Sequence, residues 1–142
     1  MQIKYMLDTN IASYLIKGNA PHLEHYIRQI PVEQVCISVI TQAELRYGVA
    51  RLPHATRLAQ QVEYFLQGIL VLDWDIAVAD AYGLVRADLE KRGQPIGNMD
   101  MQIAAHALVK DLILVTHNTK EFQRVLGLKL EDWMVEEIDC PD

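Results

Sequence analysis

Four short runs rich in consecutive apolar residues alternate with longer segments of helical spacing, and this alternation restricts the fold more than any other feature of the chain. The expected strands lie at residues 2–7, 34–38, 69–72 and 112–115. Because the apolar residues follow one another instead of alternating with polar ones, both faces of each strand should be buried. Such strands, separated by helices, are typical of a parallel sheet covered on both sides. We therefore predict an α/β domain with a central parallel sheet flanked by helices.

Helices are expected between these strands and after the last of them. The predicted helices lie at residues 10–17, 22–30, 41–52, 54–66, 75–92, 100–110 and 119–126, with a loop at 93–97. Gly18 closes the first helix, Pro31 ends the second, and Pro53 separates the third from the fourth. The acidic C-terminal end, which includes Glu131 and Asp132, is expected to be solvated or loosely ordered. We predict one domain over residues 1–133 and an acidic tail over 134–142.

The composition fits a single globular domain that works in the cytoplasm. The 142 residues, 51% of them apolar, are sufficient for one hydrophobic core. No apolar run approaches the roughly 18 residues needed to span a bilayer, and the N-terminal segment shows no signal-peptide pattern. Cys36 and Cys140 are unpatterned, which favours a reducing compartment. The net charge of -6 gives little attraction to nucleic acid, so a chain acting on RNA or DNA would need a local basic patch, a metal, or both.

Three acidic residues occupy strand–helix junctions that should meet at one edge of the sheet. Asp8 follows the first strand, Glu44 begins the helix after the second, and Asp100 begins the helix before the last. Functional residues of open parallel sheets gather beyond the carboxyl ends of the strands. Two unit charges about 4 Å apart repel by roughly 4 kcal/mol at an effective dielectric constant near 20, so three neighbouring carboxylates need a counterion. Mg²⁺ or Mn²⁺ suits oxygen ligands and activates water for phosphodiester hydrolysis.

Each of these acids also has a local structural explanation. Asp8 can form a turn or cap the helix that follows it, and Asp100 can cap its own helix. Thr41 and Glu44 have the spacing of a capping box, in which the second side chain reaches back to the start of the helix. These explanations account for one residue at a time. None of them explains why three acidic helix starts converge.

Several basic and polar residues are weaker candidates. Arg46, Arg86 and Arg92 are candidates for binding phosphate, with Arg46 first because it follows Glu44 closely, although a solvated helix face accounts for each of them. His106 is predicted to be a packed or hydrogen-bonded residue. The histidines and cysteines lack zinc spacing, and no P-loop, dinucleotide-binding glycine pattern or Gly-x-Ser-x-Gly sequence is present.

The chain resembles the PIN-domain ribonucleases, and specifically the VapC-type toxins of bacterial type II toxin–antitoxin modules. Four segments carry the resemblance: residues 6–10 (MLDTN), 37–48 (ISVITQAELRYG), 93–106 (GQPIGNMDMQIAAH) and 114–122 (LVTHNTKEF). Together they extend the resemblance from Met1 to about Trp133. The segments are specific as an ordered set, whereas any one of them alone would be weak.

The resemblance implies an endoribonuclease that depends on Mg²⁺ or Mn²⁺. By position, Asp8 and Asp100 would be the direct metal ligands, and Glu44 would orient a water or hold a second metal. Thr116 matches the small hydroxyl residue that follows the last core strand. The fourth acidic position of many PIN domains falls at or near Asn118, which is not acidic. Glu121 would then supply the missing charge, and the number of metals stays open.

The resemblance also implies partners and a substrate. A VapB-type antitoxin, a toxin homodimer and operator DNA bound only through the antitoxin complex are expected, with tRNA, and first the anticodon loop of initiator tRNA, as substrate. The residues themselves leave other classes open: a structure-specific DNA nuclease, a Mg²⁺-dependent phosphatase, or a PIN-like binding module without catalysis. The chain lacks the Asp-x-Asp pair of such a phosphatase, and a pure binding module needs no cluster of mutually repelling acids.

Overall fold

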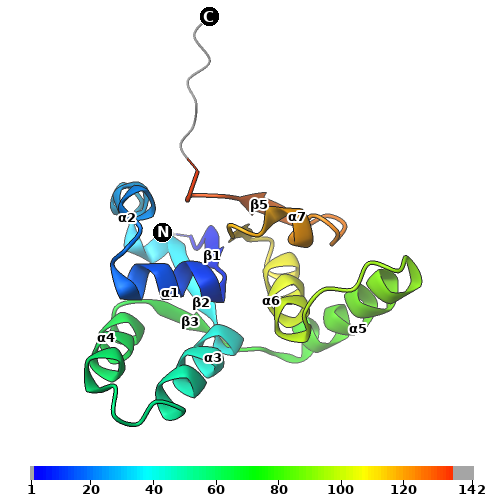
Figure 1. Cartoon of the computed structure of the whole chain (residues 1–142). Coiled ribbons are helices and arrows are strands. Elements are labelled where there is room, and N and C mark those ends of the chain that lie inside the picture. The colour runs from blue at the N-terminus through cyan, green and yellow to red at the C-terminus, as the bar shows by residue number, and fades with distance from the viewer. Residues whose placement is uncertain (1, 136–142) are drawn as a thin grey trace, which may run out of the picture.

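The computed structural model describes residues 2–135, which form a sheet of five parallel strands in the order β3-β2-β1-β4-β5 (Figure 1). The strands are β1 (Tyr5–Leu7), β2 (Val35–Ser38), β3 (Leu70–Leu72), β4 (Ile113–Val115) and β5 (Lys129–Glu131). Central β1 pairs with β2 and β4 on its two sides, so that Leu7 lies opposite Ile37 on one side and Val115 on the other. The predicted α/β fold with a parallel sheet is confirmed.

The helices follow the predicted order, with shifted ends. They are α1 (Thr9–Lys17), α2 (Pro21–Arg28), α3 (Val39–Ala50), α4 (Thr56–Gln67), α5 (Ile76–Lys91), α6 (Asn98–Val109) and the short α7 (Thr119–Phe122), with a 3-10 turn at Val32–Gln34. Helices α3 and α6 each begin two residues earlier than predicted, and α7 ends four residues earlier. Within residues 2–135, no helix has both the length and the apolar character needed to cross a membrane.

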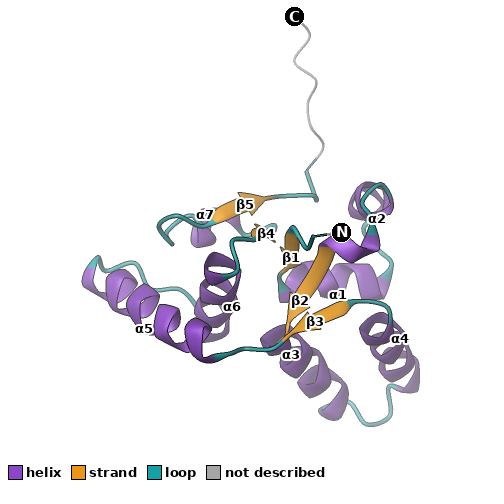
Figure 2. Ribbon diagram, turned by 180° about the vertical axis from the view of Figure 1, so that it is seen from behind, coloured by secondary structure: helices purple, strands orange, loops and turns teal. Residues whose placement is uncertain are grey.

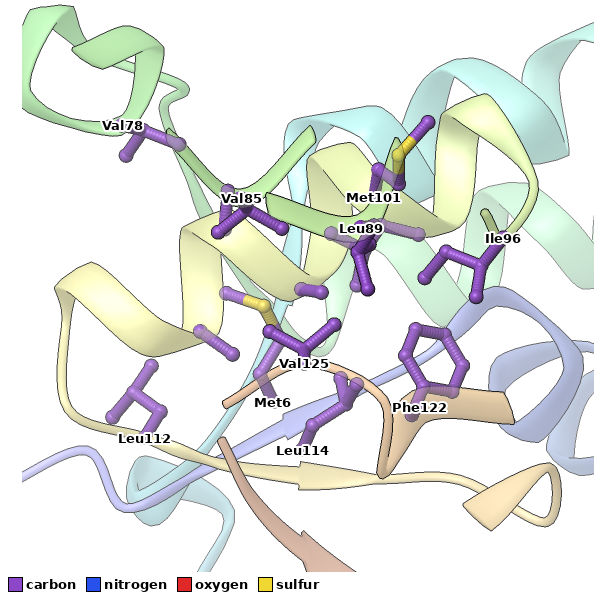
Figure 3. Close-up of a cluster of buried hydrophobic side chains, with 14 of the residues drawn as sticks. Met6, Val78, Val85, Leu89, Ile96, Met101, Leu112, Leu114, Phe122 and Val125 are labelled. Carbon is purple, nitrogen blue, oxygen red and sulfur yellow. The ribbon is translucent and has the colours of Figure 1, made fainter. Parts of the chain in front are cut away.

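The two faces of the sheet are covered by different helices (Figure 2). Successive side chains of a strand point to opposite faces. Met6 therefore packs with residues of α5 and α6, whereas Tyr5 and Leu7 pack with residues of α1 and α2. Figure 3 shows the first of these clusters, in which Met6 and Leu114 from neighbouring strands meet Val125. This two-sided burial explains why the strand segments carry consecutive apolar residues.

The fifth strand was not predicted, and the acidic C-terminal end is more ordered than expected. β5 pairs with β4 at the sheet edge, with Glu131 opposite Val115. Glu131 accepts a hydrogen bond from the buried indole of Trp133 at 2.9 Å, and Asp132 accepts one from the backbone of Met134 at 2.9 Å. The expectation of a loosely ordered end was therefore wrong for Glu131 and Asp132. Of the predicted tail at 134–142, Met134 packs against the core cluster that contains Trp133, and residues 136–142 lie outside the described residues.

Candidate active site

The three predicted acids, Asp8, Glu44 and Asp100, lie together near the carboxyl ends of the central strands. Asp8 directly follows β1, and Ser38 at the end of β2 leads into α3, which carries Glu44. The charges of Asp8 and Glu44 both act on Asp100 in α6 and raise the pKa of its carboxyl. The three acids, which are far apart in sequence, are thus near one another in space.

Asp8 is fixed both by its helix and by the next strand. It is the N-cap of α1, and its Oδ1 accepts a hydrogen bond from the backbone of Ile11 at 2.8 Å, which confirms the predicted cap. The Thr116 side chain, which follows β4, also hydrogen-bonds to Asp8. Burial raises the pKa of Asp8, of which only 3% is exposed, and the charges of Glu44 and Asp132 add to that effect. The two hydrogen bonds oppose it, so the cap and the acidic site share one residue.

Asp100 lies in the first turn of α6 but does not cap it. The N-cap is Gly97, which makes no side-chain hydrogen bond, so the capping explanation of Asp100 was wrong. Within the described residues, nothing donates a hydrogen bond to this carboxylate. Burial, followed by the charges of Glu121, Asp8 and Glu44, raises the pKa of Asp100 to about 6. This is the signature of a carboxylate that lacks a cationic partner.

Glu44 is held by another helix and not by a capping box. The N-cap of α3 is Ser38, whose Oγ accepts a hydrogen bond from the backbone of Ile40 at 3.1 Å, so the capping-box prediction was wrong. Glu44 lies in the second turn, where its Oε1 accepts a hydrogen bond from the Thr9 hydroxyl at 2.6 Å. The Thr9 and Thr41 hydroxyls are 3.1 Å apart. Thr9 was not singled out from the sequence, although it lies inside the motif that contains Asp8, and Thr41 was considered only as part of a capping box.

Asn118 and Glu121 form a connected pair near the same site. The Asn118 side-chain amide donates a hydrogen bond to Oε2 of Glu121, and the Asn118 backbone donates one to Thr116 Oγ1 at 2.9 Å. Among the charges that raise the pKa of Asp100, that of Glu121 has the largest effect. Glu121 therefore brings a negative charge close to Asp100, as a fourth acid would.

The three candidate arginines are engaged in ion pairs on helix surfaces. Arg46 pairs with Glu63 at 2.6 Å, Arg86 with Glu90 at 2.9 Å, and Arg92 with Asp88 at 2.6 Å. Ion pairs exposed to this degree contribute little to stability, so a phosphate can displace the acidic partner. Arg86 also donates a hydrogen bond to the Tyr82 hydroxyl, which donates to Asn98 at the start of α6. Arg86 is thereby the one of the three that is linked to the helix carrying Asp100.

His106 connects the two helices that carry Glu44 and Asp100. It is fully buried in α6, and its Nδ1 lies 2.8 Å from Oγ of Ser38, the N-cap of α3. Burial lowers the pKa of His106, which keeps the imidazole neutral. The prediction of a packed, hydrogen-bonded histidine is confirmed.

The donor set suits a hard divalent cation with few protein ligands. In the part of the chain that the structure describes, no group of three or more His, Cys, Asp or Glu side chains is placed so that it could hold a metal ion, so a cation would have at most two such protein ligands. Mg²⁺ commonly takes only one or two carboxylates and retains several waters. Asp8 is buried and Asp100 is partly buried, both carboxyls have raised pKa values, and an added cation would offset their repulsion. The residues therefore fit Mg²⁺ or Mn²⁺.

Comparison with known proteins identifies the class to which this fold and site belong. Residues 5–128 match the family model of the PIN domain. The tRNA(fMet)-specific endonuclease VapC of Shigella flexneri is 43% identical over 131 residues, which cover 92% of this chain and 98% of that protein. The chain therefore belongs to the PIN-domain family.

Solved structures support a narrower assignment. DNA-bound VapBC from Salmonella typhimurium matches with a TM-score of 0.87 and 38% identity, covering 92% of this chain and 98% of that one. VapBC2 from Rickettsia felis, bound to a DNA fragment from its promoter, matches with a TM-score of 0.84 and 35% identity, covering 94% of this chain and 99% of that one. Within the PIN-domain family, the chain is a VapC-type toxin ribonuclease, as its motifs predicted.

Proposed function

We propose that this protein hydrolyses phosphodiester bonds in tRNA with Mg²⁺ or Mn²⁺ held at the acidic site. The observation that carries the proposal is the convergence of Asp8, Glu44 and Asp100. Besides burial, the charge of Glu44 contributes to the raised pKa of Asp8, and the charges of Asp8 and Glu44 contribute to the raised pKa of Asp100, which has no cationic partner. When bound, the cation offsets the negative charge of the carboxylates and the phosphate and lowers the pKa of water. The initiator tRNA anticodon loop is the proposed substrate because the Shigella relative is a tRNA(fMet)-specific endonuclease.

Each side chain of the site has a proposed task. Asp8 and Asp100 hold the cation, and Glu44 orients the attacking water. Thr116 fixes the Asp8 carboxylate through its hydrogen bond. Glu121, held by Asn118, supplies the fourth negative charge. Arg86 is the favoured phosphate contact because of its link to the start of α6, with Arg46 and Arg92 as further candidates.

Incubation of the purified protein with initiator tRNA, an elongator tRNA and a DNA hairpin tests this function. We expect cleavage of initiator tRNA in Mg²⁺ or Mn²⁺ and none in excess EDTA, because the carboxylates alone cannot stabilise the developing negative charge. Asp100→Asn protein, purified in parallel, controls for contaminating nuclease. Preferential cleavage of the DNA hairpin would assign a DNA nuclease instead, and binding of tRNA without cleavage under any metal condition would assign a binding module.

We also propose that a VapB-type antitoxin binds an apolar groove of about 970 Å³. The groove is lined by residues of α1, α2, α4 and the segment before β3, among them Leu15, Ile27, Ile30, Tyr64, Phe65 and Ile69. Tyr64 is 83% exposed there, and such apolar surface is typical of an interaction site. The Salmonella and Rickettsia relatives are VapBC structures bound to DNA, which supports an antitoxin partner and contact with operator DNA through it. An amphipathic helix of the antitoxin fits a groove of this kind.

Calorimetry with the antitoxin tests the groove. A Tyr64→Asp substitution is expected to weaken antitoxin binding at least about tenfold, because it places an uncompensated charge in an apolar interface. Cleavage of tRNA by the free variant should be unchanged, since none of the proposed catalytic residues lines the groove. Unchanged antitoxin affinity, combined with weaker binding in excess Mn²⁺, would show that the antitoxin instead holds the acidic site.

We also propose that two copies of the chain form a homodimer and that the protein acts in the cytoplasm. Ile76 and Leu84 on α5 are 82% and 76% exposed, and Tyr47 on α3 is 68% exposed. Ile76 and Leu84, which lie on one helix, offer apolar surface that an interface between two copies of the chain would bury. The cytoplasm is where its proposed tRNA substrate is found.

A further inference from the structure

We infer that Thr9 is a positioning residue, which holds the Glu44 carboxylate in the orientation that RNA cleavage requires. The inference rests on the proposed nuclease function. Thr9 is the first residue of α1 and directly follows Asp8. Its hydroxyl donates to Glu44 Oε1 at 2.6 Å, across 35 positions of sequence. Two consecutive residues therefore contribute to the site: Asp8 provides one carboxylate, and Thr9 provides the hydrogen bond that holds the carboxylate of Glu44.

The direction of the hydrogen bonds around Thr9 follows from its single hydroxyl proton. An ionised carboxylate can only accept, so this proton is donated to Glu44. The Thr41 hydroxyl, 3.1 Å from Thr9 Oγ1, must then donate to Thr9. Thr41 is fully buried and precedes Glu44 by three residues on α3, so the two side chains lie on one face of the helix. The hydrogen bonds therefore run in series from Thr41 through Thr9 to Glu44, and hydrogen bonds in such a series strengthen one another.

This series of hydrogen bonds determines which carboxylate oxygen of Glu44 is available to bind water. A glutamate side chain rotates about three bonds, and the absence of a capping box leaves Glu44 without a partner in its own helix. Thr9 occupies Oε1, whereas no group in residues 2–135 donates a hydrogen bond to Oε2. Oε2 therefore remains available to accept a hydrogen bond from water at the site. Fixing this orientation before RNA binds lowers the reorganisation needed during the reaction.

A Thr9→Val substitution tests the inference, because valine keeps the shape of threonine and removes only the hydroxyl. We expect kcat for tRNA cleavage to fall roughly ten- to a hundredfold with little change in KM, as for loss of a hydrogen bond to a charged group. Thr9→Ser, which keeps the hydroxyl, should restore most of the rate. Thr56→Val is the matched control, since Thr56 is likewise the first residue of a helix, α4, and it should cleave at the wild-type rate. Thermal unfolding of each variant checks the fold, and Thr9→Ala replaces the valine variant if that variant does not fold.

A double-mutant cycle with Glu44→Gln shows whether Thr9 acts through Glu44. In the Glu44→Gln background, Thr9→Val is expected to change the rate by no more than about twofold. Mn²⁺ affinity, measured by calorimetry without RNA, should follow the same non-additive pattern. Each single variant should bind Mn²⁺ more weakly than the wild type does. A wild-type rate for Thr9→Val, or fully additive losses in the cycle, would overturn the inference. An absence of RNA cleavage by the wild type would overturn the proposed function alone, because the Mn²⁺ cycle still tests Thr9.

Discussion

Replacement of Asp100 with asparagine is expected to lower the rate of RNA cleavage by roughly a thousandfold while the protein remains folded. Asparagine keeps the shape of the side chain but removes a negative ligand. A metal ion contributes several kcal/mol of charge stabilisation to a phosphodiester transition state, which corresponds to about three powers of ten in rate. Single-turnover cleavage of tRNA in saturating Mg²⁺ measures the effect. Undiminished cleavage by this variant would remove Asp100 from the proposed metal site.

The same substitution is expected to increase stability at neutral pH. The pKa of Asp100 is raised to about 6 in the folded protein, so the folded state binds this proton more tightly than the unfolded chain does. The contribution of Asp100 to stability is therefore lost as pH rises from about 4 through about 6. Because Asp100 is only partly buried and solvent screens its charge, the loss above that range amounts to roughly 1–2 kcal/mol. An asparagine side chain does not titrate in this range, so its contribution to stability does not change with pH. Urea unfolding should show Asp100→Asn to be more stable than the wild type near pH 7.5 and little different near pH 3.5. An equal difference at both pH values would contradict the origin of the pKa shift.

Replacement of Trp133 with alanine is expected to lower the free energy of unfolding by about 3–5 kcal/mol, the usual cost of deleting a large buried aromatic side chain. Only 2% of Trp133 is exposed. Its ring stacks on Tyr26 and meets the edge of Tyr5, with both ring centres 4.9 Å away. Its indole nitrogen donates to Glu131 in β5. Through these contacts, Trp133 links β5 to β1 and α2.

Urea unfolding at constant pH measures this effect. Trp133→Phe should recover more than half of the loss, because it keeps an aromatic ring and removes only the indole hydrogen bond. Tyr64→Ala, at an exposed tyrosine, should change stability by less than about 0.5 kcal/mol. A loss below about 1 kcal/mol for Trp133→Ala would show that the end of the described chain is not part of the cooperative core.

The sequence was sufficient to predict the parts of the fold that consist of apolar runs. β1, β2, β3 and β4 are rich in consecutive apolar residues, and they were found for that reason. The expectation that both faces of each strand are buried was wrong for β3, because it lies at the sheet edge and Leu70 is 46% exposed. β5 contains only Leu130 between Lys129 and Glu131, and it pairs with a single neighbour at the sheet edge. A strand of that kind has no apolar run to reveal it. Trp133, which secures β5, was not distinguished because its partners Tyr5 and Tyr26 are more than 100 positions away.

The acids of the site were predictable from their positions at junctions, but their contacts were not. Asp8, Glu44 and Asp100 converge because parallel strands place their carboxyl ends on one edge. The capping-box prediction failed because Ser38 caps α3 three residues before Thr41, a competition that spacing alone does not resolve. The Thr9–Glu44 and His106–Ser38 contacts join residues 35 and 68 positions apart, so only the folded structure brings them together.

The apolar groove contains none of the acids of the proposed active site, and this separation bears on how related modules coexist in one cell. Discrimination between partners is a difference of two binding free energies, and substitutions in the recognition surface set it. If the groove binds the antitoxin as proposed, those substitutions can accumulate in α1, α2 and α4 without altering the carboxylates of the proposed active site. Duplicated copies of such a gene could therefore diverge in partner choice while keeping the same chemistry. Cross-inhibition between neighbouring modules would disappear through changes in the groove alone.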